Sequence, residues 1–407
     1  MSEHRTTVFR AARVFDGASF LPGPHDVTVT GRHITAVAPT DADIDGDEVV
    51  HCGGKTLVPG FIDTHVHLMM SGDPTAVALR PYSQVYYESA ANARTVLASG
   101  VTSVRDCGGA DLGMKRAIDA GIIPGPRLKI ATSVISQTGG HGDFRLPSGH
   151  TFGIVPEHEG LPHAVVDGVE EARKIARVLF RAGADHLKIC TSGGVLSPMD
   201  DPHHPQLTVD EIRVVVEEAQ AVNSYVAAHA IGAAGIRNAV RAGVRSIEHG
   251  IFADDETLAE MADKGLFLVP TLTAPTGILK KADAGIVLPD YMIAKARAVV
   301  DQHLDTVGRA HRAGVRIAMG SDSGVNPHGG HLEELALMAE AGIPLEEVLS
   351  AATRTAADLI NERESLGEIR EGYLADLVLL DIELTHANQL DKVPAHVEAV
   401  WKGGERA

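Results

Sequence analysis

The sequence has few cysteines and few aromatic residues, and it lacks the long apolar runs of a membrane protein. Its three cysteines, Cys52, Cys107 and Cys190, lie far apart and form no CxxC pair, which excludes a disulfide framework and suits a reducing compartment. No stretch of 18 apolar residues occurs, and the opening segment MSEHRTTVFR has no apolar signal-peptide core. We therefore expect a cytoplasmic protein that neither spans a membrane nor is exported.

Basic residues are also scarce, since 36 Lys and Arg face 54 Asp and Glu, for a net charge of −18. This charge repels phosphate backbones and anionic bilayers, so we expect a small-molecule substrate rather than nucleic acid or a membrane surface. Apolar residues make up 44% of the chain but aromatic residues only 4%, which predicts a globular core of Ala, Val, Leu and Ile.

The pattern of apolar residues divides the chain into two ends and a middle. Residues 1–57 and 362–407 read as short alternating strands that are too small to bury a core alone, so we expect them to form one composite β-sandwich. Residues 58–361 alternate apolar runs with amphipathic helices, which predicts an α/β protein with a (β/α)₈ TIM barrel. The eight expected strands are Phe61–His67, Thr102–Asp106, Leu128–Ser133, His186–Cys190, Tyr225–His229, Ser246–His249, Leu266–Thr271 and Arg316–Gly320.

The first expected strand ends in the histidine pair His65 and His67. Residues two apart on a strand point to the same face, and the carboxyl ends of barrel strands carry the catalytic groups. Two imidazoles placed in this way can bind one metal ion at about 2.0–2.1 Å. The alternative is a surface turn, which the preceding apolar run PGFI disfavours.

The fourth expected strand contains Lys188 within an apolar run. A buried lysine must be paired or must lose its proton. It can form a structural ion pair with Asp185, or its neutral amine can capture CO₂ to give a carbamate that bridges two cations.

Three further polar side chains end later strands. His229 and His249 close the fifth and sixth strands, each followed shortly by glycine, and either one alone is compatible with an ordinary polar residue. Asp322 follows the eighth strand. Its alternative role as a helix N-cap is disfavoured because the segment GVNPHGGH intervenes before the next helix begins near Leu332.

The order HxH, Lys, His, His, Asp on strands one, four, five, six and eight resembles the amidohydrolase superfamily, in its binuclear, carboxylated-lysine branch. The resemblance covers essentially the whole chain. It implies two divalent metal ions, zinc foremost, and a homo-oligomer. By resemblance His65, His67 and Asp322 bind one metal, His229 and His249 bind the other, and N6-carboxylated Lys188 bridges both together with a hydroxide. Asp322 is then also the general base and acid.

The bridging lysine also separates this chain from other branches that it resembles. Mononuclear deaminases lack the lysine and usually carry a glutamate shortly after the strand-five histidine, whereas this chain reads HAIGAAG. Imidazolonepropionase-like enzymes share the overall pattern but as a rule lack the bridging lysine.

The loop segments VRDCGG, GGHGD, SGGVLSPMDDP and NPHGGHLEEL resemble Xaa-Pro and Xaa-Lys/Arg dipeptidases and ochratoxin-cleaving amidases. A long loop at 136–162 is typical of a lid or a binding element. Its His141 is a candidate catalytic residue and a candidate contact of the substrate carbonyl or carboxylate, and it can equally stabilise the loop. Ser192, Ile231 and His328 are further candidate substrate contacts. Ile231 departs from relatives, which often place there a Tyr or His that donates to the substrate carbonyl.

Three residues after the first strand, Arg80, Tyr82 and Tyr86, can bind a carboxylate or form the surface of the first helix, and we favour the helix surface. Together these features predict a hydrolase that cleaves an amide bond of a dipeptide, an N-acyl amino acid or an ochratoxin-like conjugate. Two alternatives remain open: a lactone or ester hydrolase with the same metal site, and a non-catalytic metal-binding scaffold.

Overall fold

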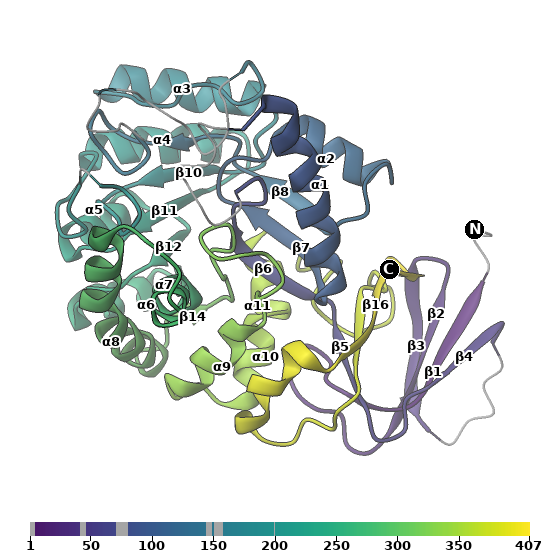
Figure 1. Cartoon of the computed structure of the whole chain (residues 1–407). Helices are drawn as coiled ribbons and strands as arrows, with labels where there is room; N and C mark the ends of the chain where they lie inside the picture. The colour runs from purple at the N-terminus through teal and green to yellow at the C-terminus, as the bar shows by residue number, and fades with distance from the viewer. Residues whose placement is uncertain (1–4, 41–45, 71–79, 144–148, 150–157, 199) are drawn as a thin grey trace.

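The computed structural model describes residues 5–40, 46–70, 80–143, 149, 158–198 and 200–407. Its central part contains two sheets of parallel strands, ordered β6-β7-β8 and β14-β13-β12-β11-β10-β9, with helices around their outer side (Figure 1). Neighbouring strands are therefore consecutive in sequence, as βαβ connections require. The strands are β6 (Phe61–Val66), β7 (Val101–Asp106), β8 (Arg127–Ile130), β9 (Val134–Ile135), β10 (Leu187–Cys190), β11 (Val226–Ala230), β12 (Ser246–His249), β13 (Phe267–Val269) and β14 (Arg316–Ile317).

The helices follow the spacing of apolar residues and begin at capping residues. In α3 the buried Ala172, Ile175, Ala176 and Leu179 recur at helical spacing along one face. In α4 the Thr208 side chain and Glu211 form a capping box. The helices are α1 (Tyr82–Ala98), α2 (Leu112–Asp119), α3 (Val169–Arg181), α4 (Val209–Ala221), α5 (Ala233–Ala242), α6 (Asp255–Asp263), α7 (Thr273–Asp283), α8 (Asp290–Arg312), α9 (Glu333–Glu340), α10 (Leu345–Ala351), α11 (Arg354–Leu359) and the 3₁₀ helix η2 (Ala387–Ala395).

The two parallel sheets are joined on both sides by individual backbone hydrogen bonds. The amide of Thr64 donates to the carbonyl of Met319 at 2.9 Å, and the amide of Asp322 donates to the carbonyl of His65 at 2.7 Å. On the other side the Asp185 amide donates to the Ile130 carbonyl at 2.7 Å. The described strands thus form two arcs of a TIM-barrel type α/β fold rather than one continuous ladder.

The third expected strand, Leu128–Ser133, is wrong in its extent. β8 ends at Ile130, and a short β9 at Val134–Ile135 pairs with β10 instead. Thr132 lies between them at φ +63°, a left-handed backbone that interrupts an extended strand.

Both chain ends contribute to one eight-stranded sheet, ordered β17-β16-β15-β5-β1-β2-β3, with β4 on β1. Antiparallel pairing of β5 with β15, including Leu57 opposite Leu379, joins the two ends. The Phe9 and Trp401 rings pack edge to face with centroids 4.7 Å apart in its core. The strands are β1 (Thr6–Val14), β2 (His25–Thr30), β3 (His33–Pro39), β4 (Glu48–His51), β5 (Thr56–Pro59), β15 (Leu377–Leu380), β16 (Val397–Lys402) and β17 (Glu405–Arg406).

Within the described ranges, every helix is too short or too polar to cross a bilayer.

Candidate metal centre

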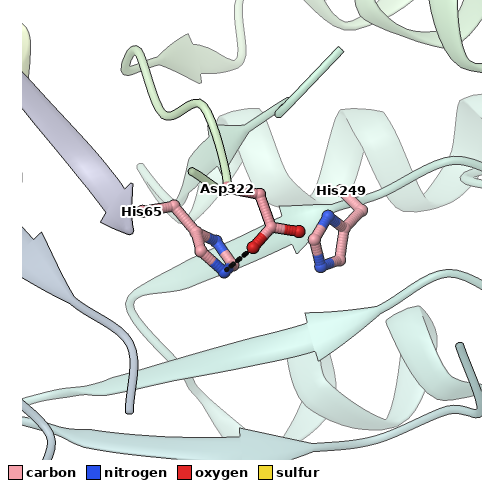
Figure 2. Close-up of side chains that lie close together, drawn as sticks. All are labelled: His65, His249 and Asp322. Atoms are coloured by element: carbon pink, nitrogen blue, oxygen red, sulfur yellow. Dashed lines mark ion pairs between the residues drawn. The ribbon is translucent and has the colours of Figure 1, made fainter. Parts of the chain in front are cut away.

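Three of the predicted ligands meet at one point near the carboxyl ends of the parallel strands. His65 lies on β6, His249 is the last residue of β12, and Asp322 follows β14. Each of these three side chains offers one ligand atom within 4.8 Å of the others (Figure 2). The Asp322 Oδ1 atom is 3.5 Å from His65 Nε2 and 3.4 Å from His67 Nε2. The resemblance assigns His65 and Asp322 to one metal and His249 to the other, so the three side chains that meet here include ligands of both metals.

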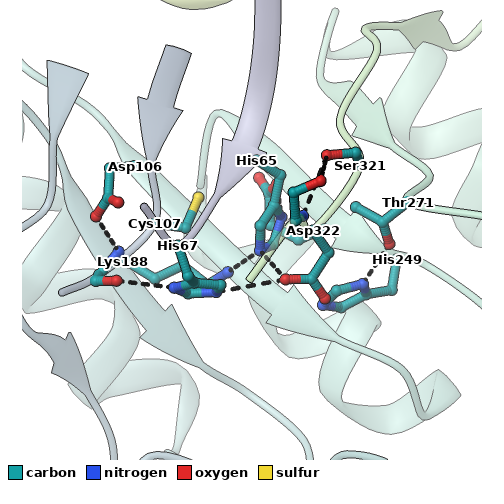
Figure 3. Close-up of polar contacts among 12 residues, drawn as sticks. His65, His67, Asp106, Cys107, Lys188, His249, Thr271, Ser321 and Asp322 are labelled. Carbon is teal, nitrogen blue, oxygen red and sulfur yellow. Dashed lines mark hydrogen bonds and ion pairs between the residues drawn. The ribbon is translucent and has the colours of Figure 1, made fainter. Parts of the chain in front are cut away.

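Lys188 and His229 adjoin this group. The Lys188 Nζ atom is 3.2 Å from His65 Nε2, and the rings of His229 and His249 have centroids 4.6 Å apart. The expected alternative partner of Lys188 is engaged elsewhere, because Asp185 accepts hydrogen bonds of 2.6 and 2.7 Å from Lys115. The ion pair between Lys188 and Asp185 therefore does not form, and the Lys188 side chain lies among the ligand histidines (Figure 3).

The hydrogen bonds behind the histidine rings determine which nitrogen can bind a metal. His65 Nδ1 contacts the Glu248 carboxylate at 2.7 Å, and His67 Nδ1 contacts the Gly108 carbonyl at 2.8 Å. His249 Nδ1 is 2.6 Å from the Thr271 hydroxyl, which itself donates to the Pro270 carbonyl. Since these partners accept, all three Nδ1 atoms carry the proton and all three Nε2 atoms present a lone pair.

His229 has the opposite orientation. Its Nε2 atom donates to the Gly193 carbonyl at 3.1 Å, which leaves the lone pair on Nδ1. Four imidazoles thus each keep one lone pair for a cation, as metal-ligating histidines do when their second nitrogen is hydrogen-bonded.

Backbone conformation at the strand ends also directs these side chains. His249, Thr271 and Asp322 have φ angles of +71°, +57° and +55°. Residues other than glycine rarely adopt this left-handed region, which costs about 1–3 kcal/mol each and clusters at functional sites. The hydrogen bond from the Asp322 amide to His65 holds one of these turns against β6.

Burial controls the charges of the cluster. Burial, and then the Lys188 charge, lowers the pKa of His67 to about 3 and that of His65 well below its usual range. Burial likewise lowers the pKa of His229 and of His249. For Asp322, burial raises the pKa to about 7, although the nearby Lys188 opposes this shift. The histidines are therefore neutral ligands at neutral pH.

These donor atoms fit a divalent metal. Asp322 Oδ1 is buried without a hydrogen-bond partner. It lies 3.5 and 3.4 Å from the Nε2 atoms of His65 and His67, so a cation held among these atoms would be stabilised by all three. Nitrogen and carboxylate oxygen are the ligands that zinc and related ions prefer.

Sequence reasoning missed a buried ion pair behind His65. The Arg105 guanidinium on β7 donates to both Glu248 oxygens at 2.8 Å and to Ser246 Oγ at 3.0 Å, and neither charged side chain is exposed. Burial lowers the pKa of Arg105, but the Glu248 charge outweighs it and the net pKa is raised. The sequence signal that could have indicated this ion pair is the presence of charged residues inside the apolar strand segments VTSVRD and SIEH.

A second missed residue, Asp63, joins β6 to the loop that carries Asp322. Its carboxylate accepts from the amides of His65 at 3.1 Å and Ser321 at 3.0 Å, and it contacts His331 Nδ1 at 2.8 Å. Its side chain is completely buried. Asp63 thus holds two neighbouring ligand-bearing segments in register.

Replacement of Glu248 by glutamine should destabilise the protein, because Arg105 keeps its charge while its counter-ion is removed. Breaking a buried pair in this way costs about 3–5 kcal/mol. Urea unfolding measures the change, and Arg213→Met is the matched control because it removes the exposed pair with Asp210, worth about 0–1 kcal/mol. An unfolding free energy for Glu248→Gln equal to that of the control variant would contradict a structural role for the pair.

Comparison with known proteins decides the family. Residues 56–407 match the model of the Amidohydrolase family. This chain belongs to the amidohydrolase family. It is accordingly a hydrolase that acts on C–N bonds. The match includes every ligand candidate described above.

Several proteins are similar to this chain over most of the length of both chains. The chain is 35% identical to the ochratoxinase of Aspergillus niger, over 86% of this chain and 75% of the relative. A crystal structure of a prolidase complexed with N-methylphosphonate-L-proline is 35% identical, with a TM-score of 0.89 over 99% of both chains. A Xaa-Pro dipeptidase with bound methionine is 30% identical, with a TM-score of 0.89 and 99% coverage of both chains.

The pocket that the six ligand candidates line contains only some of the expected substrate contacts. His141 and Ile231 line it together with apolar residues that include Ile251, Ile278 and Val299. The amide of Ile231 donates to Ser192 Oγ at 2.8 Å, and the Ser192 hydroxyl donates to the Gly193 carbonyl at 2.9 Å. Ser192 therefore braces the loop backbone and lies outside the pocket lining.

Other expected contacts lie away from this pocket. The His328 ring contacts the Met70 carbonyl at 3.1 Å and lines a neighbouring hollow. Tyr82 is exposed on α1, and Arg80 precedes this helix and pairs with Glu88 at 2.9 Å, as expected for its surface. Tyr86, also on α1, is half-buried instead, and its hydroxyl donates to Asp111 at 2.9 Å. Much of the expected lid at 136–162, namely 144–148 and 150–157, lies outside the described residues.

Proposed function

We propose that this amidohydrolase is a binuclear metal-dependent enzyme that cleaves an amide bond of a dipeptide, an N-acyl amino acid or an ochratoxin-like conjugate. The observation that carries the proposal is the set of four imidazole lone pairs beside Lys188 and the unpaired, buried Asp322 oxygen. His65, His67, His229, His249, Asp322 and N6-carboxylated Lys188 would hold the two ions, with zinc as the first candidate. When bound, such ions bring the pKa of a water near neutrality and polarise the scissile carbonyl.

Carboxylation of Lys188 would supply a second anionic group to the cluster, beside Asp322. The neutral amine forms a bond to the carbon of CO₂ and releases one proton, which leaves a carbamate with two oxygens. Lys188 is 3% exposed, and its Nζ atom lies 3.2 Å from His65 Nε2, among the ligand candidates. A carbamate at this position would place two further oxygens among those ligands, which supports the conversion.

Asp322 is the residue that we assign to proton transfer. Amide cleavage needs a group that takes a proton from water and delivers it to the leaving nitrogen, because an amine leaves poorly without one. The Oδ1 atom of Asp322 is buried without a hydrogen-bond partner in the described structure, and burial raises the pKa of Asp322 to about 7, which favours proton binding by this carboxyl.

The substrate class follows from the pocket and from the relatives. Ile231, Ile251 and Val299 pack together as an apolar cluster at the pocket. Such a wall suits a bulky acyl or side-chain group, whereas His141 offers a polar contact to the amide. The ochratoxinase, prolidase and dipeptidase relatives act on amides according to their names.

A substrate panel tests the proposal. We expect the zinc- or manganese-loaded protein to cleave ochratoxin A, L-methionyl-L-proline, N-acetyl-L-phenylalanine or acetanilide with kcat/KM above that for phenyl acetate and γ-butyrolactone. A preference of several orders of magnitude for the ester or lactone would favour the alternative hydrolase, and bound metal without any turnover would favour a scaffold.

The finer architecture is part of the same proposal. We infer that the two arcs close into an eight-stranded barrel at 58–361, which the hydrogen bonds of Thr64 and Asp185 across the gaps support. The sheet built by 1–57 and 362–407 would then fold into the composite β-sandwich. A small-molecule substrate and assembly into a homo-oligomer complete this expectation.

A further inference from the structure

A polar cluster outside the ligand set surrounds His141. Its Nδ1 atom is 2.7 Å from Ser197 Oγ and 3.2 Å from Asp200 Oδ2. The Ser197 hydroxyl donates to the other Asp200 oxygen in a short hydrogen bond. The Asp200 side chain is 5% exposed, so this is an interior site rather than a solvated surface pair.

These contacts specify one tautomer of the His141 ring. The single hydroxyl proton of Ser197 is directed to Asp200, so Ser197 Oγ can only accept from His141. The Asp200 carboxylate is also an acceptor. Burial raises the pKa of Asp200, but hydrogen bonds from His141 and Ser197 and the charge of Lys295 outweigh burial and hold the pKa well below its usual range. These acceptors therefore select the tautomer with its proton on Nδ1, which leaves the lone pair on Nε2.

The His141 ring is packed against neighbouring residues. One face stacks on the His229 ring, with centroids 4.3 Å apart and an interplanar angle of 20°. Gly194 lies at the ring as well, where an added Cβ atom would overlap it. The His141 amide also donates to Gln206 Oε1 at 2.9 Å. The ring is thus held against a proposed metal ligand at the edge of the pocket that both side chains line.

Lys295 of α8 fixes the loop that carries Asp200. Its ammonium donates to the carbonyls of Gly194 at 2.9 Å, Ser197 at 2.9 Å and Asp200 at 2.7 Å. It also lies 3.3 Å from Asp200 Oδ1. The three donors of one ammonium are therefore satisfied by three carbonyls of the loop after β10, which also carries the pocket residues Val195 and Leu196.

We propose that Asp200 is a positioning residue that fixes His141 as its Nδ1–H tautomer at the pocket, and that Lys295 holds Asp200 in place. His141 then meets the substrate with a pre-oriented Nε2 atom, which can take a proton or, once protonated, donate a hydrogen bond to a carbonyl or carboxylate oxygen. Orientation of an imidazole by a buried carboxylate is an established way to select its tautomer. The kinetic part of this proposal rests on the proposed amide hydrolysis.

The first test needs no substrate. In full-length protein labelled with ¹⁵N-histidine, the His141 resonances are identified by their loss in His141→Gln. We expect Nδ1 to be protonated in the unsubstituted protein and the tautomer ratio to shift in Asp200→Asn, because the new amide can donate to the ring. A His141 ring protonated only on Nε2 would overturn the proposal, even if every amide substrate is cleaved.

The second test is a double-mutant cycle with the best amide of the panel. We expect Asp200→Asn to lower kcat/KM by about 10- to 100-fold, and to cause no further loss in the His141→Gln background. Lys295→Met should lower it in the same direction but by less, while the exposed control Asp210→Asn leaves it unchanged. Equal losses from Asp200→Asn with and without His141 would overturn the proposal, and melting temperatures verify that each variant folds.

Discussion

Replacement of Lys188 by alanine is expected to reduce the metal content from two ions per chain to one and to remove nearly all activity. The carbamate would be the only protein ligand shared by both ions, so its loss would affect both sites at once. The loss of kcat/KM should exceed the about 10- to 100-fold that follows removal of an outer-shell partner. Elemental analysis of protein purified without chelators and then reconstituted with zinc measures the stoichiometry.

Short carboxylic acids provide the decisive control for this variant. Acetate or propionate can enter the space of the missing side chain and supply the two oxygens of the carbamate, so we expect partial recovery of both metal and activity. Lys280→Ala removes an exposed lysine that pairs with Glu333 and should retain two ions. A fully active Lys188→Ala would make Lys188 a structural residue, and one ion per chain in the unsubstituted protein would remove the binuclear centre.

Asp322→Asn is expected to abolish turnover while metal content stays close to that of the unsubstituted protein. The amide oxygen can still coordinate weakly, but the side chain no longer accepts and delivers a proton. General acid–base catalysis contributes about 10²- to 10⁴-fold, and we expect kcat to fall by that amount. Steady-state kinetics and elemental analysis on the same preparations separate the two functions of this side chain.

The exposed variant Asp305→Asn, at a residue paired with Arg309 on α8, controls for a general effect of losing a carboxylate. If Asp322→Asn retains activity within tenfold, proton transfer belongs to another residue. His141 is then the first candidate, because its Nε2 atom keeps the lone pair and its ring lines the same pocket.

The ligand candidates could be predicted from local sequence because each lies in an apolar strand or follows one. The pair His65 and His67 obeys the two-residue repeat of a strand, and Lys188 interrupts a run of apolar residues. The helix expected near Leu332 begins at Glu333, so Asp322 does not cap it. The extents of the strands could not be predicted in this way, because the break at Thr132 depends on a left-handed backbone conformation that the pattern of apolar residues does not indicate.

Contacts across the fold could not be predicted in this way. Glu248 and His65 are 183 residues apart in the sequence, and Asp200 and His141 are 59 residues apart. The sequence around each residue does not indicate its partner. The ring nitrogen that each histidine offers likewise depends on an acceptor supplied by another segment, such as Gly108 for His67.

The sequence by itself determined the order of strands and helices and the chemical types at the strand ends, because apolar periodicity and side-chain chemistry are local properties. Only the tertiary structure decided that Asp185 pairs with Lys115 rather than Lys188, and that Ser192 braces a loop. It also brings ligand atoms of His65, His249 and Asp322 within 4.8 Å of one another. These outcomes depend on which buried polar groups become neighbours when the strands assemble, and on the need of each such group for a partner.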